Sequence, residues 1–215
     1  ELLFKQPEST HLGDCPICFI PLPLDRKKSI MHSCCSKLIC DGCHHANLLR
    51  EAEVRRGVSR CPFCRETTPS TKKESYKFMM KRIMANDPVA LCHKGGEKYN
   101  EGNYPSAFEW YTRAAGSEDM EAHYRLSQMY DLGKGIEKDG GKHLHHLEEA
   151  AIGGHPDARF NLGCDEEDER GNIERAVRHF IISANLGDDG SIKALMKYFK
   201  EGFVSKDDLA AALRA

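Results

Sequence analysis

The sequence predicts a small metal-stabilised module that a linker helix joins to an all-α solenoid of helix hairpins. Three observations predict this fold class. Eight of the ten cysteines fall between Cys15 and Cys64, a helical pattern follows a short polar linker, and the remainder of the chain repeats itself about every 35 residues. With 215 residues, 40% of them apolar, the chain is long enough for two modest domains.

The boundaries follow from these patterns. The module spans residues 12–66, the linker and connecting helix span 67–86, and the helical repeats with a C-terminal capping helix span 87–215. The formal charge of −2 hides a split, because residues 1–86 carry 15 Lys and Arg against 9 Asp and Glu, and the rest carries 16 against 24. We therefore expect the two parts to meet different partners.

Several partners and compartments are not expected. The positive surplus of the first part is the only support for a nucleic-acid partner. It lacks a dense Lys/Arg stripe interleaved with aromatic residues, so we expect no nucleic acid. No apolar run is long enough to span a bilayer, so no membrane partner is expected. Residues 1–10 lack a secretory pattern, and the cysteine usage favours an intracellular location, cytoplasmic or nuclear.

The cysteine spacing indicates metal binding rather than a disulfide framework. The eight cysteines form four pairs, and three of these pairs have the C-x2-C spacing: Cys15 and Cys18, Cys34 and Cys35, Cys40 and Cys43, Cys61 and Cys64. Four thiolates complete a tetrahedral zinc site with no open position, so eight predict two structural zinc ions. The region is too small to be held together by apolar burial alone, and the metal replaces the missing core.

These cysteines resemble the RING family in its eight-cysteine variant. The resemblance implies a zinc-stabilised α+β RING module in which the two metal sites interleave. Pairs one and three bind the first ion, and pairs two and four bind the second. In this sequence the implied sets are Cys15, Cys18, Cys40 and Cys43 for one ion, and Cys34, Cys35, Cys61 and Cys64 for the other.

Two alternatives remain open for the ligands. Cys34 and Cys35 are adjacent, which leaves little room for both to reach one ion, so His32 is an alternative to Cys34. A sequential arrangement, with the first two pairs on one ion and the last two on the other, is the second alternative.

The RING resemblance implies an E3 ubiquitin ligase with no covalent catalytic residue of its own. Such a module holds a ubiquitin-charged conjugating enzyme. Ile17, Pro62 and Arg65 match positions at which the family contacts that enzyme, and a guanidinium at the position of Arg65 can donate to two proteins at once. Leu48, with Phe63, is expected to complete the apolar surface.

One residue departs from the family pattern. Asn47 stands where the family often has a bulky apolar residue, which leaves Leu48 as a substitute only by a shift of register. This departure favours the alternative function, a non-catalytic zinc-containing scaffold for protein complexes. The enzyme class therefore leans towards a RING-type transferase without being fixed.

A capping pattern precedes the connecting helix. Thr71 and Glu74 have the spacing of a capping box. Apolar residues then recur at helical spacing, which predicts a helix over residues 74–85.

From residue 87 onward, pairs of small residues mark the ends of helices. The pairs are separated by 36 and 33 residues, and a glycine follows each, as expected for helix C-caps. The pairs are Ala114–Ala115, Ala150–Ala151 and Ser183–Ala184, and the glycines are Gly116, Gly153 and Gly187. This pattern predicts a helix–turn–helix unit stacked about three and a half times, with a capping helix over residues 206–215.

One unit carries a distinctive turn. Residues 129–139 read Met-Tyr-Asp-Leu-Gly-Lys-Gly-Ile-Glu-Lys-Asp, and Glu149-Ala150-Ala151-x-Gly153 closes the unit. Both segments resemble the Sel1-like repeat, a relative of the tetratricopeptide repeat. The resemblance covers about residues 87–202 and implies Sel1-like helix hairpins that hold a protein substrate or adaptor. The loops of the first and third units, residues 99–103 and 165–172, are shorter than the pattern.

The remaining chemically active residues are expected to be structural. Cys92 and Cys164 have no neighbouring partner in the sequence and are expected to be buried as small apolar residues. The histidines at 143, 145 and 146 predict a solvated helix face. The acidic residues 165–169 lack calcium-loop spacing and predict a solvated loop. We expect no catalytic residue.

Overall fold

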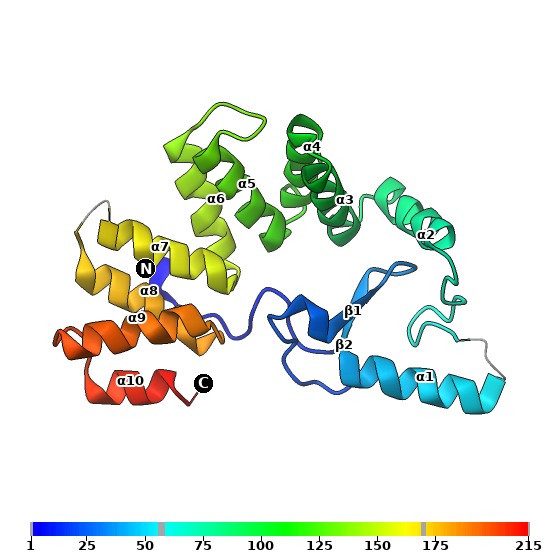
Figure 1. Cartoon of the computed structure of the whole chain (residues 1–215), viewed down its shortest axis with the longest axis horizontal. Helices are drawn as coiled ribbons and strands as arrows, with labels where there is room; N and C mark the ends of the chain where they lie inside the picture. The colour runs from blue at the N-terminus through cyan, green and yellow to red at the C-terminus, as the bar shows by residue number, and fades with distance from the viewer. Residues whose placement is uncertain (1, 56–58, 169–170, 215) are drawn as a thin grey trace. The chain divides into compact units, whose positions relative to one another are not determined.

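The computed structural model describes residues 2–55, 59–168 and 171–214, and they divide into two compact units (Figure 1). One unit is Leu12–Asp119. The other, here called the helical unit, combines Glu1–His11 with Met120–Ala215, so the first residues of the chain belong with the later helices.

The cysteine region contains a short hairpin followed by a helix. Its elements are the 3-10 helix η2 (Arg26–Lys28), strands β1 (Ser29–His32) and β2 (Lys37–Cys40), and helix α1 (Asp41–Arg55). The two strands are antiparallel, with Ser29 opposite Cys40 and His32 opposite Lys37. The hairpin places Cys34 and Cys35 in its turn, and β2 delivers Cys40 directly to the start of α1.

The apolar core of this region is small. Its buried members are Cys15, Leu22 and Ile39, and half-buried residues such as Leu12 and Phe63 pack around them. Such a core is too small to balance the conformational entropy of some fifty ordered residues, so a second stabilising element is required.

Helix α2 (Lys72–Met84) starts two residues before the predicted helix. The Thr71 hydroxyl accepts from the backbone N–H of Glu74 at 3.2 Å, as the capping pattern predicts. The Glu74 carboxylate also accepts from the N–H of Ser70 at 2.9 Å, a hydrogen bond that the capping box does not include.

The rest of the chain forms helix hairpins, which confirms the predicted solenoid. The compact unit Leu12–Asp119 contains the hairpin of α3 (Pro88–Asn100) and α4 (Tyr104–Ala115). The helices from residue 120 onward are α5 (Met120–Leu132), α6 (Gly140–Ile152), α7 (Pro156–Asp168), α8 (Ile173–Asn185), α9 (Asp189–Lys200) and α10 (Lys206–Ala212). Helices pack in consecutive pairs, and α10 packs on α8 and α9 as the predicted cap.

A small residue facing an aromatic ring recurs within these hairpins. A Cβ added to Gly95 of α3 would lie 2.6 Å from the ring of Tyr111 of α4. A Cβ on Gly163 of α7 would lie at the same distance from the ring of Phe180 of α8. The close approach of the two helices in each of these hairpins therefore depends on a glycine.

Two expectations for the repeats are wrong. Residues 165–168 continue helix α7 instead of forming a loop, and Glu169 lies outside the described residues. The helix continues because Glu166 is buried and its carboxylate lies 2.9 Å from Arg175 Nε. The pairing with Arg175 offsets the cost of burying the Glu166 carboxylate.

The histidines of α6 do not form a solvated face either. His143 and His146 are half-buried against α5, and only His145 is exposed. His143 lies 3.0 Å from the carbonyl of Ser127, and His146 lies 3.1 Å from His123. Among the helices that the structure describes, none combines the length and apolar character that crossing a bilayer requires.

Candidate metal centres

The structure brings the eight clustered cysteines together in two groups of four. In each group the sulfur atoms all lie within 4.8 Å of one another. The first group is Cys15, Cys18, Cys40 and Cys43, and the second is Cys34, Cys35, Cys61 and Cys64. This is the interleaved grouping that the RING resemblance implies, not the sequential one.

The sulfur spacing fits a tetrahedral metal ion. Cys18 Sγ and Cys40 Sγ are 3.8 Å apart, and Cys35 Sγ and Cys61 Sγ are 3.6 Å apart. Zinc–sulfur bonds of about 2.3 Å in a tetrahedron place two sulfurs about 3.8 Å apart. A disulfide needs about 2.0 Å, and all ten cysteines are free thiols. Both groups therefore suit zinc.

Two C-x2-C turns with the same backbone design supply half of the sulfurs. In the first turn, Phe19 N–H donates to Cys15 O at 2.8 Å. In the second, Arg65 N–H donates to Cys61 O at 3.1 Å. A single bridged residue pair closes each turn, Asp14 with Pro21 and Arg60 with Thr67.

Backbone donors favour the thiolate form of the first cysteine in each turn. Burial raises the pKa of Cys15, but N–H groups that include that of Cys18 outweigh it and lower the pKa to about 6. The N–H groups of Cys64 and Phe63 likewise outweigh burial and lower the pKa of Cys61.

Cys34 and Cys35 of the second group show the opposite effect. Burial and the neighbouring sulfurs raise the pKa of Cys34, and they raise that of Cys35 to about 11. Four thiolates cannot share such a site without a cation, and a bound divalent ion supplies the missing charge.

His32 is not a member of either group. Its ring is buried beside the second group, where it packs edge-to-face on Phe63 at 6.4 Å between ring centres and lies 5.8 Å from the ring of His44. Burial lowers the pKa of His32. The geometry thus favours Cys34 over His32 as the companion of Cys35.

The four candidate contact residues lie at the module surface to different degrees. Ile17 and Leu48 are large apolar residues with 41% and 39% of their surface exposed. Pro62 is half-buried, and Arg65 is exposed. The structure places Ile17, Pro62 and Arg65 on the two C-x2-C turns and Leu48 on α1.

Asn47 and Phe63 both have structural roles in the module. The side-chain amide of Asn47 on α1 donates to the carbonyl of Arg60 at 3.2 Å, which ties the helix to the segment before Cys61. Phe63 is half-buried and packs against the small core. Asn47 and Arg60 are 13 positions apart, so the sequence around Asn47 shows the departure from the family pattern but not this contact.

A third group, His11, Glu121 and His155 in the helical unit, does not suit a metal. His11 and His155 stack with ring centres 4.1 Å apart and planes within 10° of parallel. A metal bound by two imidazoles lies close to both ring planes, and stacked parallel planes share no such point. Glu121 instead lies 3.2 Å from His155 Nε2 and 3.7 Å from His11 Nε2, so one carboxylate serves both rings.

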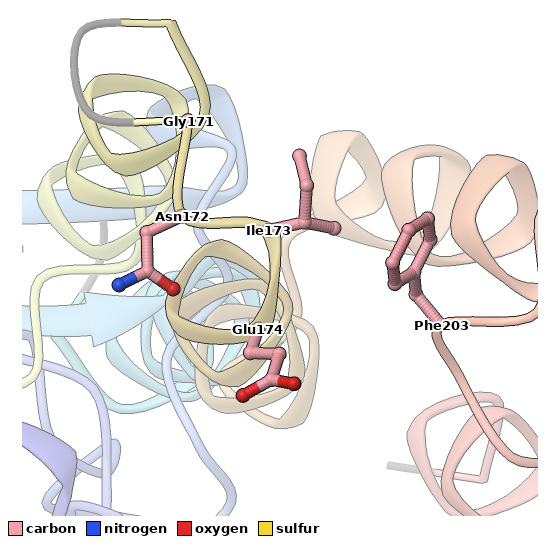
Figure 2. A pocket seen from close by; sticks show the side chains of 5 residues that line it. All are labelled: Gly171, Asn172, Ile173, Glu174 and Phe203. Atoms are coloured by element: carbon pink, nitrogen blue, oxygen red, sulfur yellow. The ribbon is translucent and has the colours of Figure 1, made fainter.

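The hollows in the helical unit are less specific than the cysteine groups. One shallow hollow has a volume of about 410 Å³. The residues that line it, drawn in Figure 2, are Gly171, Asn172, Ile173, Glu174 and Phe203. The Asn172 side chain is already used as the N-cap of α8, where it accepts from Arg175 N–H at 3.2 Å. Because the Asn172 side-chain oxygen already accepts this hydrogen bond, the hollow has fewer polar groups available to bind a ligand.

Cys92 and Cys164 are half-buried rather than fully buried. Burial, with the acidic residues around it, raises the pKa of Cys164 to about 11. This thiol is therefore protonated and unreactive near neutral pH.

Comparison with known proteins supports the repeats most strongly. Residues 89–118, 121–155 and 156–188 match the family model of the Sel1 repeat. A solved Sel1 repeat protein from Oxalobacter formigenes, 24% identical, has a TM-score of 0.58 over 66% of this chain and 62% of its own. A protective antigen of uropathogenic Escherichia coli with an SLR fold, 23% identical, has a TM-score of 0.54 over 63% of this chain and 32% of its own.

Two curated relatives match shorter segments. An uncharacterised protein of Neisseria meningitidis serogroup B is 29% identical over 110 residues, which are 47% of this chain and 22% of that protein. A protein of Ostreid herpesvirus 1, whose name provisionally calls it a RING finger protein, is 36% identical over 61 residues, 27% of this chain and 25% of its own. The chain thus matches a quarter or less of the length of either relative.

The matching family model covers the repeats and does not extend into the cysteine region. Residues 89–118, 121–155 and 156–188 are therefore Sel1 repeats by sequence, and they form an all-helical repeat array by fold.

Proposed function

We propose that this protein is a RING-type E3 ubiquitin ligase whose cysteine module holds two structural zinc ions and whose Sel1 repeats hold a protein substrate or adaptor. The interleaved grouping of the eight cysteines carries the proposal. Each ion then ties together chain segments that are distant in sequence, which substitutes for the small core. The need for reduced thiols favours an intracellular setting.

Exposed residues on the two turns support recruitment of a ubiquitin-conjugating enzyme. Arg65 has a backbone φ of 61° and Phe19 one of 58°, although a residue with a Cβ is strained in this region. Strain at an exposed position that packing does not require points to a functional role. The Arg65 guanidinium is suited to bridge two proteins, and Ile17, Pro62 and Leu48 supply apolar contact.

The module itself takes no part in bond formation. The conjugating enzyme carries ubiquitin as a thioester, and a neutral lysine amine of the substrate attacks the thioester carbonyl carbon. An amide bond forms, the carbon–sulfur bond breaks, and the conjugating enzyme leaves as a thiolate while the amine loses a proton to solvent. The module holds the thioester in a conformation that favours this attack.

A reconstituted ubiquitylation assay tests the proposal. With a panel of conjugating enzymes we expect zinc-dependent ubiquitin chains, and we expect Ile17→Ala and Arg65→Ala each to reduce the rate at least 10-fold, about 1.4 kcal/mol in the barrier. Lys28→Ala, which removes another exposed positive charge of the module, is the matched control and should keep full activity. No chains with any conjugating enzyme, or full activity of Arg65→Ala, would contradict the proposal.

The second candidate is a non-catalytic zinc-containing scaffold. The Sel1 repeats favour it, since stacked helix hairpins present long surfaces for protein partners. Asn47 also favours it, because its amide is engaged with Arg60 where an apolar contact is expected of a ligase. A chain that assembles partners through its repeats and yields no ubiquitin transfer would establish the scaffold.

A further inference from the structure

Residues 2–11, here called the anchor segment, run along the helical unit instead of leading directly into the cysteine module. The 3-10 helix η1 (Leu2–Phe4) packs against α6 and α8. At the other end of the segment, His11 N–H donates to Gly154 O at 3.0 Å. The anchor segment therefore spans from α8 to the turn between α6 and α7.

A fully buried arginine donates a hydrogen bond to the backbone of this segment. Arg159 of α7 has no exposed surface, and its Nη2 donates to Ala151 O at 2.7 Å while its Nη1 donates to Leu3 O. A buried guanidinium is stable only where acceptors surround it. The helical unit thus presents a buried donor that requires a main-chain carbonyl from a bound segment.

Two arginines and a histidine surround the aromatic ring of Phe4. The guanidinium carbons of Arg175 and Arg178 each lie 4.8 Å from the ring centre. The His179 ring centre lies at the same distance. Cations over an aromatic face favour Phe, Tyr or Trp at this position over an aliphatic residue. Leu3, beside it, packs against the apolar cluster that contains Leu147.

Further along, the surface fits an extended backbone closely. Gly154 has a φ of +82°, and a Cβ there would lie 2.6 Å from the carbonyl oxygen of Ser9. Asn185 Nδ2 donates to Gln6 Oε1 at 3.1 Å. The surface therefore recognises an apolar–aromatic pair, a polar side chain two residues later, and a main chain that passes close to Gly154.

The anchor segment is only partly covered, whereas the surface beneath it is buried. None of residues 2–11 is buried, and Leu3 and Phe4 are its half-buried apolar anchors. By contrast, Arg159, His155 and His179 beneath it are all buried. The tether of this segment to the chain keeps it near the surface, so the segment competes with a partner peptide for the same contacts.

We propose that this surface is a docking site for an extended peptide of a partner protein that carries an adjacent Leu-Phe pair, and that the anchor segment occupies the site in cis until such a partner displaces it. The proposal deepens the partner part of the proposed function, on which it rests, by stating the chemistry of what the repeats hold. Its test contains no ubiquitin, so failure of docking and failure of ligase activity are separate outcomes.

Fluorescence polarisation on the full chain tests the proposal. The probe is a labelled peptide with the sequence of residues 1–13. The Leu3→Ala/Phe4→Ala chain lacks the cis anchors and should bind it at least 10-fold more tightly than the unsubstituted chain. A probe with alanine in place of Phe4 should bind this chain at least 10-fold more weakly than the intact probe. Adding Arg178→Ala to the chain should weaken binding, whereas Lys193→Ala, an exposed cation on α9, should not.

Hydrogen exchange on the unsubstituted chain provides a second measurement that needs no folded variant. Saturating unlabelled peptide should speed amide exchange at residues 3–11 at least 10-fold. Unchanged exchange, or no binding of the peptide to a folded Leu3→Ala/Phe4→Ala chain, would overturn the proposal. A concentration-dependent dimer that disappears in that variant would assign the site to a second copy of the chain and overturn it as well.

Discussion

Phe19 and Arg65 occupy the same position in two equivalent turns. Each directly follows the second cysteine of a C-x2-C pair, and each has a left-handed backbone, with φ of 58° and 61°. The N–H of each donates to the carbonyl of the first cysteine of its pair, which fixes this conformation. Both side chains are exposed, Phe19 to 77%, so packing on the module core does not explain why either residue has a side chain.

Glycine at either position should relieve this strain. We expect Phe19→Gly and Arg65→Gly each to raise the free energy of unfolding of the zinc-loaded chain by roughly 0.5–1 kcal/mol. Glycine removes the cost of the left-handed backbone in the folded chain, and the greater conformational freedom of glycine in the unfolded chain offsets part of this gain. Denaturant unfolding at fixed zinc concentration measures the change. Arg65→Gly should at the same time lose ubiquitin transfer. If both variants are less stable than the unsubstituted chain, the side chains are structural and the argument from strain fails.

Neighbouring glycines in α3 should respond in opposite directions to alanine. Gly95→Ala forces a Cβ to within 2.6 Å of the Tyr111 ring, and we expect a loss of about 1–3 kcal/mol in stability. Gly96→Ala is the matched control, since its Cβ would meet the Tyr111 hydroxyl at an ordinary 3.7 Å. It should gain up to about 1 kcal/mol from helix propensity. Thermal unfolding separates the two, and equal effects would show that α3 and α4 are not closely packed at this point.

The histidine contacts between α5 and α6 should make the helical unit sensitive to acid. Burial, with the nearby charge of His123, lowers the pKa of His146 from 6.5 to about 4. Between these values the unfolded chain binds a proton that the folded chain does not, so this contribution is complete above pH 6.5 and is lost towards pH 4. Allowing for partial exposure, we expect it to be about 1–2 kcal/mol. Asp165 raises the pKa of His143, which acts in the opposite direction.

Comparing variants isolates this effect from loss of metal in acid. The stability difference between pH 7.5 and pH 5 should be about 1 kcal/mol smaller for His146→Gln than for the unsubstituted chain. His145→Gln, on the exposed side of the same helix, should change it by less than a third as much. A larger acid sensitivity in His146→Gln would contradict the assignment.

Periodic and spaced features of this chain were predictable, and long-range polar contacts were not. Cysteine spacing, with the RING resemblance, predicts both groups of four, and small-residue pairs predict the helix hairpins. The extension of α7 to Asp168 was not predictable, because Glu166 is buried in an ion pair with Arg175, nine positions away. The anchor segment has no periodicity, and its place depends on Arg159, 156 positions from Leu3. Such pairings are created by the tertiary fold, so no window of sequence contains them.

The proposed ligase and scaffold functions both depend on an interleaved module with two zinc ions. The metal content of the chain tests this module most directly. Native mass spectrometry of the chain, combined with zinc-edge X-ray absorption, should find two zinc ions, each with four sulfur ligands at about 2.3 Å. The Cys34→Ala chain should lose the ion of the second group or bind it more weakly, whereas the His32→Ala chain should retain both zinc ions. A single ion, or an average shell containing nitrogen, would contradict the two groups of four cysteines.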